Sequence, residues 1–105
     1  MPRYTTPDAE LYRELTPDAL AAYAKAQGFT LEAVYPKSTT LETLHGEGFQ
    51  VDIPNRVTFA DYPRRVGEIL DTLSAATLIP IPGLLHMISP DAFTEARILR
   101  LLGLP

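Results

Sequence analysis

The chain has 105 residues, of which 46% are hydrophobic and 21% are charged, so it has the length and composition of one globular domain. This balance argues against intrinsic disorder and against a collagen-like repeat. Nine basic and thirteen acidic side chains give a net charge of -4. Binding to nucleic acid without sequence specificity usually needs a basic domain, so this negative charge argues against it.

Three short motifs predict where helices begin. Each places a hydroxyl residue at the N-cap, proline at the first helical position and aspartate in the first turn, which together satisfy and neutralise a helix N-terminus. The motifs are Thr6-Pro7-Asp8-Ala9, Thr16-Pro17-Asp18-Ala19 and Ser89-Pro90-Asp91-Ala92. We therefore expect helices to begin at 7, 17 and 90.

The first part of the chain, 7–27, is predicted to form two helices, Pro7 to about Leu15 and Pro17 to Gln27, the second ended by Gly28. Residues 30–54 then change to a period of two, typical of strands. The expected inward residues are Leu31, Ala33, Tyr35, Phe49, Val51 and Ile53. Thr39 to Leu44 is the expected middle strand, between a turn at 36–38 and a hairpin loop at 45–48.

The second half is predicted to be helical at both ends. A helix over 61–76 carries an apolar stripe of Tyr62, Val66, Ile69, Leu70 and Leu73. Residues 77–89 read as an apolar connector broken by prolines. The last helix, 90–103, is expected to hold Phe93, Ala96, Leu99 and Leu102 on one face and to be closed by Gly103.

These elements predict a single α+β domain over 1–105, with a three-stranded antiparallel meander and helices packed on one face, in the order α-α-β-β-β-α-α. The chain lacks cysteine, and no apolar stretch reaches the ~20 residues that a membrane span needs. The charged N-terminal region is unlike a secretory signal. We therefore expect a soluble cytoplasmic protein.

Catalytic and metal-binding motifs are missing from the sequence. The two histidines, His45 in the expected hairpin loop and His86 in the apolar connector, have no ligand spacing around them. No nucleophile motif surrounds Ser38, and nothing predicts a cofactor or phosphate site. An enzyme remains a lesser alternative, through carboxylates that would share the outer face of the sheet: Glu32, Glu42 and Asp52.

Nucleic-acid binding is a second alternative. The order helix, three strands, helix is that of double-stranded-RNA-binding domains. The cations for such a surface would be Arg56, Arg64 and Arg65, but Asp61 stands beside the arginine pair where a lysine cluster would be needed.

From Ala19 to Leu73 the chain resembles a group of uncharacterised bacterial proteins. The residues that carry the resemblance are Leu20-x-x-Tyr23, Gly28-Phe29-Thr30-Leu31, Val51-x-Ile53-Pro54 and Asp61-Tyr62-x-Arg64-Arg65-x-x-Glu68-Ile69-Leu70-x-x-Leu73. The resemblance implies a shared α-β-β-β-α unit and no known activity, so it supplies no functional residues.

The uncharged apolar segment between Thr72 and Pro90 is the most informative feature for function. An apolar surface of this kind that is not covered by the chain itself usually binds a partner. We expect a small non-enzymatic protein-binding or regulatory module that self-associates, with a candidate role as an accessory or defence-related bacterial or phage protein. The predicted docking surface consists of 78–88 and the last helix, with the contact residues Leu78, Ile79, Ile81, Leu84, Leu85, Met87 and Phe93. Whether 78–88 is core or interface stays open at the level of sequence.

Overall fold

A computed structural model describes residues 11–34 and 40–103 and confirms the α+β class. A 3-10 turn, η1 (Leu11–Glu14), and helix α2 (Pro17–Ala26) precede three strands, β1 (Thr30–Val34), β2 (Thr40–Gly46) and β3 (Phe49–Pro54). Three helices follow, α3 (Tyr62–Thr77), α4 (Ile81–Ile88) and α5 (Glu95–Leu101). The predicted turn at 36–38 and the start of a helix at Pro7 lie outside the described residues.

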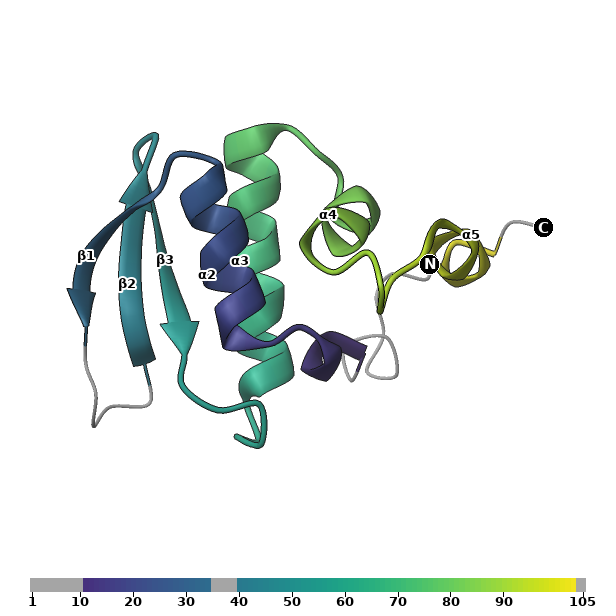
Figure 1. The fold of residues 1–105 in the computed structure, drawn as a ribbon, viewed down its shortest axis with the longest axis horizontal. Coiled ribbons are helices and arrows are strands. Elements are labelled where there is room, and N and C mark those ends of the chain that lie inside the picture. The colour runs from purple at the N-terminus through teal and green to yellow at the C-terminus, as the bar shows by residue number, and fades with distance from the viewer. Residues whose placement is uncertain (1–10, 35–39, 104–105) are drawn as a thin grey trace.

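The sheet is an antiparallel meander in the order β1-β2-β3, so β1 and β3 are its two edges (Figure 1). The β2–β3 hairpin closes on the pair Gly46 and Phe49. Its turn is Glu47-Gly48 alone, and both residues have positive φ, 53° and 80°, as a two-residue hairpin turn requires. The predicted four-residue loop is therefore wrong: His45 and Gly46 belong to β2, because the tight turn lets the strands pair up to Gly46.

Helices α2 and α3 pack on one face of the sheet, over β2 and β3 (Figure 1). The core between these layers includes Leu44, Val51, Ile53, Val66 and Leu70, all at most 2% exposed. The predicted inward alternation of β3 is thus confirmed.

Strand β1 lies beyond the helix layer, and its predicted inward face is not buried. Leu31 is 50% exposed, because no helix covers this strand among the described residues and a bulge between Leu31 and Ala33 breaks the register.

The local signals around α2 and α3 act as predicted. The Thr16 side chain accepts a hydrogen bond from the backbone N–H of Ala19, 3.1 Å away, and Gly28 takes the positive φ that ends the helical region. Helix α3 begins directly after Asp61 with Pro63 in its first turn, where proline costs no internal hydrogen bond. Both predicted starts are confirmed.

The segment predicted as a connector, 77–89, contains a helix. Pro80 and Pro82 lie immediately before and inside the first turn of α4, where proline is tolerated, so the prolines start this helix instead of preventing one. Leu84 and Leu85 of α4 are buried, at 0% and 5% exposure, and they extend the core beyond the sheet layer.

The last helix begins later than the sequence predicts. The motif at 89–92 forms a turn in which the Phe93 N–H donates to the Ser89 carbonyl at 2.8 Å. The side chain of Thr94 then caps α5 by accepting from the Arg97 N–H at 3.2 Å. The predicted common face is also wrong, because Phe93 is buried in the turn before the helix and Ile98 is the buried residue of α5 itself.

Candidate functional site

A groove between α4 and α5 is lined mainly by apolar side chains. Its volume is about 240 Å³. Helix α4 supplies one wall and helix α5 the other, with the lining residues Pro82, Gly83, His86, Glu95, Ile98 and Leu99. We call this site the α4–α5 groove.

Exposed leucines continue the apolar surface along α5. Leu99, Leu101 and Leu102 are 42%, 40% and 49% exposed. Glu95 and Leu99, at i and i+4, line the groove, and the C-cap residue Leu102, at i+7, continues the same side of the helix. Leu101 lies on a different side of α5. Helix α5 packs mainly against α4 and lies at the end of the molecule farthest from the sheet (Figure 1).

One ion pair joins α5 to η1. Arg97 donates two hydrogen bonds to the Glu14 carboxylate, at 2.7 and 2.6 Å, and its guanidinium lies 4.7 Å from the centre of the Phe93 ring. The hydrogen bond from Arg97 lowers the pKa of Glu14, and the same bond raises the pKa of Arg97. The pair therefore stays charged at neutral pH and holds α5 against η1.

His86 holds the opposite wall of the groove. Its Nδ1 lies 2.8 Å from the Phe93 carbonyl oxygen, which only accepts, so Nδ1 carries the proton in this hydrogen bond. His86 is half-buried and one of its ring nitrogens is satisfied by the protein backbone, as in a structural histidine. Its role here is to join the end of α4 to the turn that leads into α5.

The predicted contact residues divide between core and surface. Leu84, Leu85 and Phe93 are buried, at 0%, 5% and 0% exposure, and hold the α4 region to the rest of the fold. Ile79 and Ile81 are half-buried against the core. Only Leu78 and Met87, at 87% and 49% exposure, are exposed.

The sequence prediction includes the last helix in the docking surface, but it does not name the exposed leucines at that helix, Leu99, Leu101 and Leu102, among the contact residues. The sequence carries a signal for their exposure. Leucines this close together in a helix cannot all lie on one buried face, so at least one of them must be exposed.

The arginines of the nucleic-acid alternative do not form one cluster, and two of them already interact with other side chains. Arg64 pairs with Asp61 at 3.4 Å and with Glu68 at 3.0 Å. Arg65 donates to the Thr40 hydroxyl at 2.7 Å, and Arg56 is exposed in the segment that leads from β3 to α3. Two acidic side chains beside Arg64 reduce the positive potential that phosphate contacts need.

The carboxylates of the enzyme alternative do not share one face. Glu42 is paired with Ile53 across the hairpin and lies 3.3 Å from Lys25 of α2, so it is on the helix side of the sheet. Asp52 is on the other side, where it accepts hydrogen bonds from Thr43 and Gln50. The bulge between Thr40 and Glu42 shifts the register, which a strict alternation misses.

No group of three or more metal-ligating side chains converges within residues 11–34 and 40–103. His45 is exposed on β2, paired with Thr30 and Gln50, and no acidic cluster lies around it there. Over the same residues, no single helix is long and apolar enough to cross a membrane; α3 and α4 pass that test only as a pair bent by 102°.

Comparison of the chain with protein-family models, with curated proteins and with solved structures found no match. The functional assignment therefore depends on the geometry of the chain itself.

Proposed function

We propose that the chain is a protein-binding module that forms a homodimer through the α4–α5 groove and the exposed leucines of α5. The observation that carries this proposal is the exposure of Leu99 and Leu102 on the groove side of α5, a helix joined to η1 by a two-point ion pair. A helix face that is already folded in the single chain can bind without first becoming ordered.

A second copy fits this surface because each chain offers both halves of the contact. The leucine side of α5 can pack into the groove of the other copy while its own groove receives the other's leucines, as in the isologous two-fold contacts that most homodimers use. The mainly apolar groove and the adjacent leucine side chains thus match in polarity.

The charges on α5 also favour an antiparallel pairing of two copies. Glu95 stands in the first turn of the helix and Arg100 in the last. In an antiparallel arrangement, the acidic end of each α5 lies beside the basic end of the other, and the two helix dipoles are opposed. A parallel arrangement would place like charges together.

Sedimentation velocity at micromolar concentrations, with Leu99→Glu as the test variant, examines this proposal. We expect the wild-type chain to sediment as a dimer that dissociates on dilution. Two buried, unpaired carboxylates in a two-fold contact should raise the dissociation constant at least roughly ten-fold. Helix α5 should stay folded, because Leu99 is exposed in the single chain.

Leu31→Glu is the matched control, because Leu31 is also a half-exposed leucine but lies on β1 at the opposite end of the molecule (Figure 1). This variant should dimerise as the wild type does. A wild-type chain that is monomeric at high micromolar concentration would disprove the proposal, and so would equal weakening by both substitutions.

A further inference from the structure

We propose that Met87 is a site of reversible oxidation by peroxide, and that the Tyr23 hydroxyl holds the resulting sulfoxide oxygen by a hydrogen bond that ties α4 to α2. The two side chains meet where α2 and α4 pack together, and neither of them lines the α4–α5 groove. This site is therefore separate from the proposed dimer contact.

Tyr23 is a buried hydrogen-bond donor with a weak acceptor. It is 8% exposed, and its hydroxyl lies 3.9 Å from the Sδ atom of Met87. A thioether accepts hydrogen bonds only weakly, whereas a buried tyrosine hydroxyl usually finds a full partner. Within residues 11–34 and 40–103 this hydroxyl has no stronger acceptor. Burial also raises the pKa of Tyr23, so the phenol keeps the proton that it donates.

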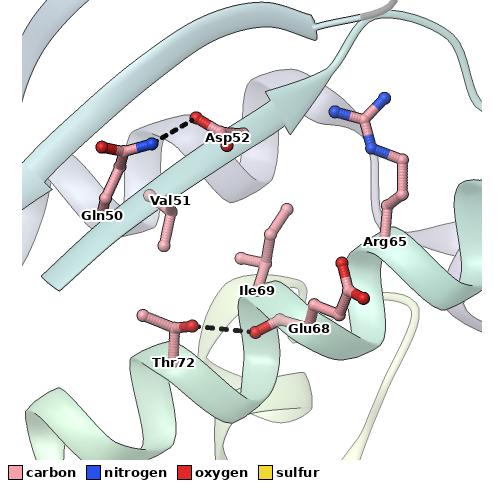
Figure 2. A pocket seen from close by; sticks show the side chains of 7 residues that line it. All are labelled: Gln50, Val51, Asp52, Arg65, Glu68, Ile69 and Thr72. Carbon is pink, nitrogen blue, oxygen red and sulfur yellow. Dashed lines mark hydrogen bonds between the residues drawn. The ribbon is translucent and has the colours of Figure 1, made fainter.

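Two polar side chains beside β3 and α3 show the more common arrangement. A pocket of about 160 Å³ lies between these elements (Figure 2). On its rim, Gln50 donates to the Asp52 carboxylate at 3.1 Å, and Thr72 donates to the Glu68 backbone carbonyl at 3.0 Å. The Tyr23 hydroxyl differs from both groups, because its acceptor is a sulfur atom that can itself gain an oxygen.

Met87 is accessible to a small oxidant. It is 49% exposed, and the chain has no cysteine and only one other methionine, Met1, to compete for peroxide. The thioether sulfur attacks one oxygen of hydrogen peroxide, the O–O bond breaks, and the second oxygen leaves as water. Sulfur loses two electrons and becomes the sulfoxide. The reverse step, catalysed by a methionine sulfoxide reductase, oxidises two thiols to a disulfide and releases the oxygen as water.

The space between the two side chains suits the added oxygen. The separation of 3.9 Å exceeds the roughly 2.7–2.8 Å of an O–H···O hydrogen bond. An oxygen bonded to Sδ on the side of Tyr23 brings an acceptor closer to the hydroxyl, and rotation within the flexible methionine side chain completes the bond. Oxidation thus replaces a weak contact between α2 and α4 with a stronger one.

The first measurement treats the full chain with hydrogen peroxide and locates the added oxygen by peptide mapping with mass spectrometry, which separates Met87 from Met1. We expect Met87 to be oxidised within a few-fold of the rate of a free methionine peptide, and a methionine sulfoxide reductase with a thiol reductant to remove the oxygen. Protection of Met87 under conditions that fully oxidise the free peptide would overturn the proposal.

The second measurement compares the reduced and oxidised forms of the wild type with those of Tyr23→Phe in urea denaturation. A neutral hydrogen bond changes the unfolding equilibrium constant by roughly two- to ten-fold, so oxidation should favour the folded wild type over folded Tyr23→Phe by a factor of this size. Tyr12→Phe is the matched control, because Tyr12 is also buried but packs near Gly67 of α3, and it should respond to oxidation as the wild type does. Equal effects of oxidation on the wild type and Tyr23→Phe would overturn the proposal.

Nuclear magnetic resonance of the tyrosine rings tests the same bond on the unmodified sequence, should Tyr23→Phe fail to fold. Oxidation should shift the Tyr23 ring signals and raise the pKa of its hydroxyl further, because the sulfoxide oxygen binds only the protonated phenol. Unchanged Tyr23 signals would contradict the contact. Leu99→Glu should show the same shift as the wild type, so a failed dimer and a failed oxidation site give different results.

Discussion

Arg97 and Glu14 join two parts of the chain that are 83 residues apart, through two hydrogen bonds of 2.7 and 2.6 Å. Arg97 also donates to the Ala92 carbonyl at 2.7 Å and covers the Phe93 ring. One side chain therefore connects η1, the turn before α5 and α5 itself. Because α5 buries little apolar surface of its own, this connection decides how firmly the proposed contact helix is held.

Glu14→Gln is expected to loosen α5 without unfolding the core. The carboxylate is partly exposed, and exposed ion pairs contribute roughly 0.2–1 kcal/mol, so amide exchange in α5 should become about 1.5- to 5-fold faster. Hydrogen exchange followed by mass spectrometry measures this. Glu68→Gln is the control, because it removes an exposed ion pair on α3 and should leave the exchange of α5 unchanged. Equal exchange in Glu14→Gln and wild type would contradict the prediction.

Acid should release α5 in the same way. The hydrogen bond from Arg97 lowers the pKa of Glu14 from its usual value of 4.5. When the pKa of a carboxyl group is lower in the folded state than in the unfolded state, its ionised form stabilises the fold at pH values above the unfolded pKa. This stabilisation is lost as the pH falls through the lower, folded-state pKa. Carboxyl-detected titration should show the low pKa in the wild type. In Arg97→Gln the pKa of Glu14 should return toward 4.5, and an unchanged pKa would contradict the role of Arg97.

The stability of the fold at alkaline pH depends on the ionisation of Tyr62. Its hydroxyl donates to the Leu15 carbonyl, its side chain is fully buried, and burial raises its pKa to about 12 from 10.0. The neutral phenol is favoured in the folded state, so its contribution is complete below pH 10 and is lost as the pH rises toward 12. The loss is on the order of 2 kcal/mol.

Tyr62→Phe isolates that contribution. The variant should be less stable at neutral pH by roughly 1–3 kcal/mol, because it leaves the Leu15 carbonyl without its donor. It should also lose less stability than the wild type between pH 10 and 12, where only the wild type ionises Tyr62. Urea denaturation at a series of pH values measures both differences. Parallel curves for the two proteins across that interval would contradict the assignment.

Most of the fold could be predicted from sequence signals that lie within a few residues of the helix or strand they determine. Thr16 and Gly28 bound α2, and the alternation from Phe49 to Ile53 fixes the inner face of β3. These signals act through neighbouring backbone atoms, so the sequence alone carries them.

The start of α5 and the lining of both pockets depend on residues far apart in the chain. Ser89 and Thr94 both fit an N-cap, and the choice between them follows from the burial of Phe93 and the bond from Arg97 to Glu14. Likewise, the bulge in β2 turns Glu42 toward Lys25 and separates it from Asp52. No local pattern reports these contacts.

Gly46 marks a close approach between β2 and the segment after α2. An added Cβ would lie 3.0 Å from the Phe29 Cα and 3.1 Å from its ring, and Phe29 is only 3% exposed. Gly46→Ala should therefore destabilise the fold by roughly 1–3 kcal/mol through overpacking. Gly67→Ala is the matched control within α3, where the nearest atom would be Tyr12 Cε2 at an ordinary 3.6 Å.

Alanine is favoured over glycine in a helix by roughly 0.5–1 kcal/mol, so Gly67→Ala should stabilise the chain while Gly46→Ala destabilises it. Urea denaturation of the two variants gives both signs in one experiment. Two changes of the same sign would show that Phe29 can move away from the added methyl group, or that α3 cannot accept one.

Leu78 ends α3 with a left-handed backbone, φ 63° and ψ 24°, although it is not glycine. This conformation destabilises a residue with a Cβ by roughly 1–2 kcal/mol. Glycine does not have this strain, but part of the gain is offset because glycine loses more conformational entropy on folding. Because the side chain is 87% exposed, little burial is lost. Leu78→Gly should therefore stabilise the fold by roughly 0.5–1 kcal/mol.

Leu78→Ala separates backbone strain from side-chain contact. It keeps the Cβ and should leave stability in thermal denaturation close to that of the wild type, whereas Leu78→Gly should raise the melting temperature. Both variants should also dimerise normally, because Leu78 does not line the α4–α5 groove. If both variants weakened the dimer, Leu78 would belong to the contact surface, as the sequence predicts, and the strain at this corner would serve to present its side chain.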